Sequence, residues 1–206
     1  MTNPNCSTVF LAMTLAAVRQ FHPTAVSVTT LQAASGAGYP GVSSLDLLGN
    51  VIPFISGEEE KIENETRKIL GSLVDGRIEP DSVIVSAQTT RVAVVNGHTE
   101  MISVRFATMP SREDLLHAFA SFWGPPQQHR LPTAPETPVI YLNEGNRPQP
   151  RLDVERERGM VVFVGRLRPC PVLGYKFVAL GHNTIRGAAG AAVLNAELMS
   201  AEGMLD

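Results

Sequence analysis

The sequence predicts an α+β fold with a mixed, largely antiparallel sheet covered by helices. Segments rich in valine, isoleucine and threonine follow one another at short intervals, which is typical of strands joined by turns. Strands that do not alternate regularly with helices favour antiparallel pairing. Because domains of ~150 residues are common, we expect the 206 residues to form a single domain, residues 1–206.

The first two predicted elements are a helix and a strand. Apolar residues recur at helical spacing from Ser7 to Gln20, so Cys6 is expected at a helix start. Residues 24–32 are rich in valine and threonine and predict a strand, followed by a flexible glycine-containing run over 33–41. No helix follows these glycines, so we expect no dinucleotide-binding βαβ unit within this chain.

The middle of the chain predicts a helix and two strands. Residues 56–70 have acidic side chains in the first turn and basic ones in the last, which suits the helix dipole, and Gly71 ends the helix. Residues 82–95 and 99–108 predict strands, and Asn96-Gly97 between them is typical of a hairpin turn. His98 would then lie beside this turn.

The last third of the chain predicts two helices and two strands. A capping pair at Ser111 and Asp114 begins a helix over 111–123. Prolines recur from 127 to 150, so this stretch is expected to be a mostly extended surface excursion. Strands are then predicted over 160–167 and 173–180, and an alanine-rich helix over 184–199.

Charge and cysteine content exclude several classes of protein. The net charge of −3 and pI near 6.0 predict no nucleic-acid partner and no anionic membrane partner. No apolar stretch is long enough to span a membrane. The two cysteines, Cys6 and Cys170, have no metal-ligand spacing, so we expect no metal site, a reducing compartment and a cytoplasmic location.

Cys6 and His98 are the first candidates for chemistry. Unpaired N–H groups at a helix N-terminus stabilise a thiolate, so Cys6 is a candidate nucleophile, although a lone cysteine is more often a small buried residue. His98 is a candidate acid or base, although a histidine beside a turn is usually exposed. Arg91 precedes His98 by an odd number of residues, so the turn must reorient His98 for the two to share a face.

Glu58 and Gln32 are the next candidates. Glu58 and Lys61 lie three residues apart and therefore share one helical face, although a cluster of charges at a helix start is usually a solvated end. Gln32 ends a predicted strand, where its amide would face either water or a bound carbonyl.

Six strings in order give the chain a close resemblance to one family, the aspartate-β-semialdehyde dehydrogenases, in particular their archaeal and fungal branch. The resemblance extends over nearly the whole chain, and it implies the C-terminal domain fold of the glyceraldehyde-3-phosphate dehydrogenase-like group. The strings are Asn3-Pro4-Asn5-Cys6-Ser7-Thr8, residues 30–41 (TLQAASGAGYPG), residues 50–55 (NVIPFI), Gly57-Glu58-Glu59-Glu60-Lys61, residues 91–100 (RVAVVNGHTE) and residues 183–190 (NTIRGAAG).

The resemblance implies a catalytic role for three residues. Cys6 matches the nucleophile that forms an acyl-thioester, His98 the general acid and base, and Gln32 the residue that orients the acyl intermediate. Such a thiolate displaces phosphate from L-aspartyl-4-phosphate, and hydride transfer from the reduced form of NADP, NADPH, then yields L-aspartate-4-semialdehyde, a step in lysine, methionine and threonine biosynthesis.

The resemblance also implies binding residues. Arg91 and Glu58 match the residues that hold the substrate's α-carboxylate and α-amino group, and a planar guanidinium suits a carboxylate well. Glu58 is chosen from three consecutive glutamates only by its interval to Lys61, which matches the phosphate-site lysine. The residues that match segments beside the nicotinamide half of NADP are Ser35, Gly36, Gly38 and Asn183.

Family members have a nucleotide-binding domain of ~150 residues ahead of the cysteine helix, which this sequence does not contain. We therefore expect a catalytic and dimerisation domain, a homodimer or homotetramer, with little or no dehydrogenase activity alone. The helix over 184–199 would pack on the missing domain. Two other readings stay open: another acyl-phosphate reductase, such as an N-acetyl-glutamyl-phosphate reductase, and a non-catalytic dimerisation or substrate-binding module.

Overall fold

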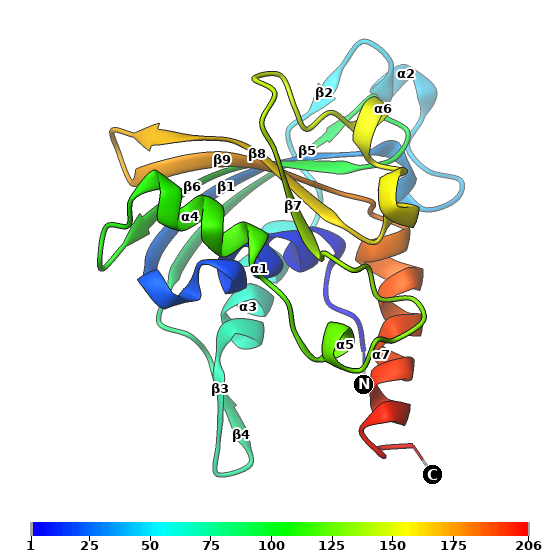
Figure 1. The fold of residues 1–206 in the computed structure, drawn as a ribbon. Coiled ribbons are helices and arrows are strands. Elements are labelled where there is room, and N and C mark those ends of the chain that lie inside the picture. The colour runs from blue at the N-terminus through cyan, green and yellow to red at the C-terminus, as the bar shows by residue number, and fades with distance from the viewer. Residues whose placement is uncertain (1, 206) are drawn as a thin grey trace.

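A seven-stranded mixed sheet organises the protein (Figure 1). The computed structural model describes residues 2–205, and within them the strand order is β2-β5-β1-β6-β9-β8-β7. The β1/β5 and β7/β8 pairs are parallel and the other four are antiparallel, which confirms the predicted α+β class. The strands are β1 (Pro23–Gln32), β2 (Val51–Ile52), β5 (Ile84–Val92), β6 (His98–Phe106), β7 (Val139–Leu142), β8 (Val162–Cys170) and β9 (Gly174–Gly181).

Helices cover one face of this sheet. The longer helices are α1 (Cys6–Ala17), α3 (Glu58–Leu70), α4 (Arg112–Ala120) and α7 (Gly190–Ala201). Helix α1 contacts β6, β8 and β9, α3 contacts β5, and α4 contacts β7. Helix α7 follows a single π-helical turn, Ile185–Ala189, and runs away from the sheet to the C-terminus (Figure 1). Short helices are α2 (Ser44–Leu47), α5 (Pro125–Gln128) and α6 (Pro150–Asp153).

The helix starts follow from local sequence signals. Asn5 caps α1, because its side-chain oxygen accepts hydrogen bonds from the Ser7 and Thr8 amides. Ser111 and Asp114 form the predicted capping box of α4. Three glutamates occupy the first turn of α3, where the helix dipole favours them. The predicted helices are thus confirmed, with small differences at their ends.

The predicted hairpin at Asn96-Gly97 is wrong. Strands β5 and β6 are not neighbours, because β1 lies between them, parallel to β5 and antiparallel to β6. His98 is therefore the first residue of a central strand and is fully buried, not exposed beside a turn. A turn sequence predicts only that the chain changes direction, not that the strands on either side of the turn pair with each other. Here β1, from earlier in the chain, lies between β5 and β6.

The predicted surface excursion over 127–150 is only partly correct. Residues Val139–Leu142 form β7, which joins the sheet beside β8, and the Val139 side chain is fully buried. The prolines confine β7 to four residues at the sheet edge, where a strand needs partners on one side only. A second feature absent from the prediction is the hairpin of β3 (Ser72–Val74) and β4 (Arg77–Glu79), which projects beyond α3 (Figure 1).

One face of the central sheet is covered by helices, and the opposite face is exposed. Alternate residues of β1 and β5, among them Val26, Val28 and Val85, point toward the helices and are buried. Residues of the opposite face are exposed, such as Ile84 at 69% and Met101 at 45%. No helix among residues 2–205 is long and apolar enough to cross a membrane.

Candidate functional site

Cys6 is the first residue of α1 and lies in a closely packed position. The side chain of Asn5 satisfies the first free amides of the helix, at 2.9 Å from the Ser7 nitrogen and 3.3 Å from the Thr8 nitrogen. A Cβ atom on Gly187 would lie 2.7 Å from the Cys6 Cβ, so only glycine fits beside the cysteine. The turn that leads into α7 therefore packs against this end of α1.

The predicted stabilisation of a Cys6 thiolate is wrong for this state of the protein. Burial, and next the negative charge of Glu58, raise the pKa of the Cys6 thiol from 9.0 to about 11, and the charge of Glu100 adds to the rise. The Ser7 amide lowers the pKa, but by less. The effect of the helix N-terminus on the pKa of the Cys6 thiol is thus smaller than the combined effect of burial and the nearby carboxyl groups.

Glu58, the first residue of α3, connects three side chains of the site. Its Oε2 atom accepts hydrogen bonds from Asn5 Nδ2 at 2.7 Å and from Gln32 Nε2 at 3.2 Å. Its Oε1 atom lies 3.7 Å from Lys61 Nζ, which confirms that the two residues share a helical face. Glu58, rather than its neighbours, therefore contacts the residue before the cysteine.

Gln32 and Arg91 lie side by side at the ends of parallel strands. The register of β1 and β5 pairs Gln32 with Arg91, and both side chains are buried, with 1% and 5% exposed. Arg91 Nη1 donates a hydrogen bond to the Ala33 carbonyl oxygen at 2.8 Å. Burial lowers the pKa of Arg91, while the negative charges of Glu58 and Cys6 act to raise it. The guanidinium is therefore in electrostatic reach of both groups.

His98 is held in one tautomer by the backbone. Its Nδ1 atom accepts a hydrogen bond from the Ala33 amide at 3.0 Å, which assigns the proton of the neutral ring to Nε2. Burial, and then the charges of Arg91 and His182, lower the pKa of His98 to about 3, so the ring is neutral at physiological pH. Nε2 is buried and has no hydrogen-bond partner within residues 2–205.

The predicted cofactor loop is ordered against these residues. The Ser35 amide bonds to the Val95 carbonyl, and a Cβ on Gly36 would lie 2.7 Å from Arg91 Nη1 and 3.0 Å from His98 Nε2. Asn183 Nδ2 donates to Ser35 Oγ at 2.8 Å, and Asn183 Oδ1 accepts from the Gly97 amide at 2.8 Å. The loop thus covers the buried arginine and histidine, and Asn183 fixes it.

The structure brings the predicted residues into one connected region. A first chain of contacts links Asn5, Glu58, Gln32 and Lys61, and a second links Arg91 and His98 through the backbone of Ala33. Prediction from the sequence assigned Asn5 no contact with Glu58, although an asparagine directly before a helix is itself a capping signal. It also missed the role of Gly187, for which the sequence shows no distinct signal.

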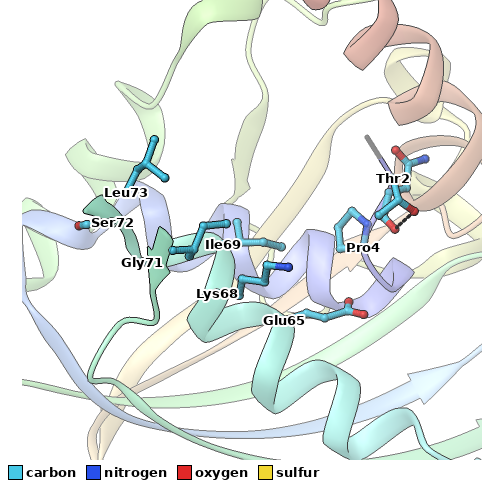
Figure 2. Close-up of a pocket in the computed structure, with 10 residues that line it drawn as sticks. Thr2, Pro4, Glu65, Lys68, Ile69, Gly71, Ser72 and Leu73 are labelled. Atoms are coloured by element: carbon cyan, nitrogen blue, oxygen red, sulfur yellow. Dashed lines mark hydrogen bonds between the residues drawn. The ribbon is translucent and has the colours of Figure 1, made fainter. Parts of the chain in front are cut away.

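A separate hollow adjoins this region, and the Glu65 carboxylate on its wall accepts a hydrogen bond from the Asn5 amide at 2.6 Å (Figure 2). Its volume is about 430 Å³, and it is formed by the N-terminal segment, the outer face of α3 and the β3–β4 hairpin. Pro4, Glu65 and Ile69 line it, and none of the predicted site residues does. Within the described chain no three histidine, cysteine or acidic side chains are grouped to hold a metal ion.

The fold and this arrangement agree with one family. The family model described as "Semialdehyde dehydrogenase, dimerisation domain" matches residues 15–186, and the chain belongs to this family.

Individual relatives are aspartate-semialdehyde dehydrogenases. The chain is 48% identical over 203 residues to that of Methanothermobacter thermautotrophicus, covering 97% of this chain and 58% of the relative. It is 47% identical over 213 residues to that of Schizosaccharomyces pombe, covering 100% of this chain and 59% of the relative. The crystal structure of aspartate semialdehyde dehydrogenase with NADP from Candida albicans aligns with a TM-score of 0.90 at 42% identity, covering 98% of this chain and 57% of that one. The chain thus spans less than two thirds of the length of these relatives.

Proposed function

We propose that this chain supplies the catalytic half of an NADP-dependent aspartate-semialdehyde dehydrogenase, which converts L-aspartyl-4-phosphate to L-aspartate-4-semialdehyde and phosphate. The supporting observation is the convergence of Cys6, Gln32, Glu58, Arg91 and His98 from five separate elements. The names of the relatives favour this substrate over an N-acetyl-glutamyl phosphate.

Two charged side chains suit the amino-acid end of this substrate. Arg91 is a buried guanidinium able to form two parallel hydrogen bonds to an α-carboxylate. Glu58 is a carboxylate whose charge matches an α-ammonium group. Lys61 has a 56% exposed side chain 3.7 Å from Glu58, where a mobile cation can meet an incoming phosphate.

Substrate binding at Glu58 would activate Cys6. The charge of Glu58 raises the pKa of the Cys6 thiol, so an ammonium group paired with Glu58 removes that penalty. The thiol releases its proton to solvent, the thiolate sulfur forms a bond to the acyl carbon, the bond from that carbon to the phosphate oxygen breaks, and phosphate leaves with the electron pair. The product is a thioester on Cys6, with Gln32 placed to donate to its carbonyl oxygen.

His98 would act as a hydrogen-bond donor toward the substrate oxygen. Its Nδ1 atom is occupied by the Ala33 amide, so the Nε2–H group is the one available to a ligand. This group can stabilise an oxyanion at the acyl carbon by a hydrogen bond, while the ring stays neutral. When the carbon–sulfur bond breaks, the oxyanion becomes the aldehyde carbonyl and the sulfur of Cys6 leaves with the electron pair.

The loop at residues 35–38 and Asn183 support a proposed part of a nicotinamide site. Gly36 places no side chain between its loop and His98, and a Cβ on Gly38 would have nothing within 4 Å. Ser35, Gly36 and Gly38 therefore fit contact with the nicotinamide end, whereas Asn183 fits the task of holding Ser35. NADPH, when bound, supplies the hydride that reduces the thioester. We propose that the partner domain of the longer relatives holds the remainder of the cofactor and packs on α7.

The acyl-transfer half of this reaction tests the proposal with the 206-residue chain. We expect L-aspartyl-4-phosphate to release one equivalent of phosphate per chain and to leave an aspartyl adduct on the peptide containing Cys6. Hydroxylamine should remove the adduct, as it does with thioesters. The absence of both adduct and phosphate release from the folded chain would contradict the proposal.

We also propose a homodimer and a cytoplasmic location. The family is defined by a dimerisation domain, and the sheet face opposite the helices exposes Ile84 and Met101. Light scattering should give twice the chain mass, and charged substitutions at these two positions should shift it to the monomer mass. The location rests on Cys6 and Cys170, which are both free thiols, as expected in a reducing compartment.

A further inference from the structure

Glu100 on β6 is a buried acid that the proposed reaction does not use. Its side chain is 0% exposed, and neither carboxyl oxygen has a hydrogen-bond partner among residues 2–205. An ionised carboxylate in such a place loses its hydration and gains nothing in return, so the neutral acid is strongly preferred. Burial accordingly raises the pKa of Glu100 well above its usual 4.5.

The position of Glu100 places it next to the site. It lies two residues from His98 on β6, so both side chains project from the same, helix-covered face of the sheet. In the sheet register it lies between Thr30 on β1 and Ala179 on β9. Thr30 Oγ1 in turn accepts a hydrogen bond from Gln32 Nε2 at 3.4 Å. Glu100 therefore belongs to the row of side chains directly beside Gln32 and His98, under α1.

Two carboxyl groups act on the Cys6 thiol from different elements. Glu58 at the start of α3 and Glu100 on β6 both raise its pKa when ionised, and Arg91 on β5 is the cation within reach. The strand neighbours of Glu100, Thr30 and Ala179, do not titrate, and His98 is neutral. The charge of Glu58 can be neutralised by a ligand, but the fully buried Glu100 can be neutralised only by a proton.

We propose that Glu100 is a positioning residue that keeps its proton so that Cys6 can lose its own. A thiolate at Cys6 and a carboxylate at Glu100 oppose each other, so the two acids titrate as a coupled pair, and the proton on Glu100 leaves the first negative charge of the pair to the Cys6 sulfur. The proposal rests on the proposed function, because it treats Cys6 as the nucleophile. Glu100 thereby sets the upper pH limit of nucleophile activation.

Glu100→Gln tests this coupling, because glutamine has the shape of the neutral acid and cannot ionise. The probe is iodoacetamide, and the alkylation rate of the Cys6 peptide is followed by mass spectrometry from neutral to alkaline pH. The Cys6 alkylation rates of wild type and variant should be equal near neutral pH, and the rate of the variant should be about threefold higher at alkaline pH. A pKa lower by about one unit gives tenfold more thiolate, and the lower nucleophilicity of that thiolate offsets part of the gain.

Two controls separate coupling from a loss of packing. The Cys170 peptide in the same sample should keep its rate in both proteins. Thr66→Val removes another buried, unpartnered polar atom, on α3, and should leave the Cys6 profile unchanged. A folded Glu100→Gln variant whose profile matches wild type at every pH, or one slowed at every pH together with Thr66→Val, overturns the proposal.

Infrared spectroscopy of the wild-type chain gives a second test that needs no variant to fold. At neutral pH the spectrum should contain the C=O stretch of a protonated carboxyl group, which disappears as the pH is raised toward the alkaline limb of the alkylation profile. A spectrum with carboxylate bands only contradicts the proposal. Neither measurement uses substrate or cofactor, so failure here leaves the phosphate-release test of the proposed function standing, and the reverse also holds.

Discussion

The two cysteines of this protein lie in opposite electrostatic environments. Cys6 begins a helix, yet burial and the carboxylate of Glu58 raise the pKa of its thiol to about 11. Cys170 ends a strand, and hydrogen bonds from the backbone at Leu173 and Val172 lower the pKa of its thiol below 9.0. The residue proposed as the nucleophile is therefore the less acidic of the two.

A helix N-terminus alone therefore does not make a cysteine reactive. At Cys6 the capping side chain of Asn5 satisfies the first amides of the helix and also donates to Glu58, a negative group. At Cys170 hydrogen bonds act with no comparable carboxylate. We therefore assign the activation of Cys6 to the ligand, whose ammonium group neutralises Glu58, and Cys170 has no role in the proposed reaction.

Replacing each cysteine in turn should give the largest difference in acylation rate. Cys6→Ser removes the nucleophile, so acylation by L-aspartyl-4-phosphate should fall by at least about a hundredfold, because an alcohol is far less nucleophilic than a thiolate. Cys170→Ser should keep the wild-type rate. The readout is phosphate release per chain, and equal rates in the two variants would remove the distinction between the cysteines.

The His98 donor should have the next largest effect. His98→Asn keeps a polar side chain but loses the imidazole Nε2–H, and acylation should slow by about a hundredfold. Alkylation of Cys6 by iodoacetamide should change little, because the proposed role of His98 is toward the substrate oxygen. A large loss of Cys6 alkylation would instead indicate that His98 acts on the sulfur.

His98 also predicts how stability depends on pH. Its pKa is about 3 in the folded protein and 6.5 when unperturbed, so below pH 6.5 the unfolded chain binds a proton that the folded chain does not. Stability is therefore full above 6.5 and declines as the pH falls from 6.5 toward 3, by roughly 2 kcal/mol at about pH 5. Urea unfolding of wild type and His98→Asn over this range should show a smaller decline in the variant. Parallel curves would show that His98 is not buried in its neutral form.

Glu58 should have the smallest effect on the free protein. Glu58→Gln removes the largest charge that opposes the Cys6 thiolate, so alkylation of Cys6 at alkaline pH should rise by about threefold. Cys170 should be unaffected, and Glu60→Gln, an exposed glutamate one position beyond Glu59 on the same helix, is the matched control. An unchanged Cys6 rate would show that the charge of Glu58 does not reach the sulfur.

Local patterns predicted most of the helices and central strands correctly. The capping box at Ser111 and Asp114 and the acidic first turn of α3 both act within a few residues, and both are confirmed. The pairing of β5 and β6 was predicted wrongly, because the insertion of β1 between them depends on residues some sixty positions earlier.

The candidate site, too, was predictable from the sequence only in part. The roles that the family resemblance implies for Cys6 and its partners stay predictions, whereas the three-residue spacing correctly linked Glu58 to Lys61. The raised pKa of the Cys6 thiol could not be predicted from the sequence, because it depends on burial and on a carboxylate from another helix. Glu100 was overlooked, since its burial and missing partners exist only in the folded chain.

Activation of Cys6 by the substrate ammonium group is tested most directly by comparing two acyl phosphates on the 206-residue chain. L-aspartyl-4-phosphate has the ammonium group that would pair with Glu58, and succinyl phosphate lacks it but is otherwise alike. At saturating concentrations the account predicts that phosphate release from the aspartyl compound is at least about threefold faster, and that Glu58→Gln abolishes the difference. Equal saturated rates with wild-type protein would contradict it.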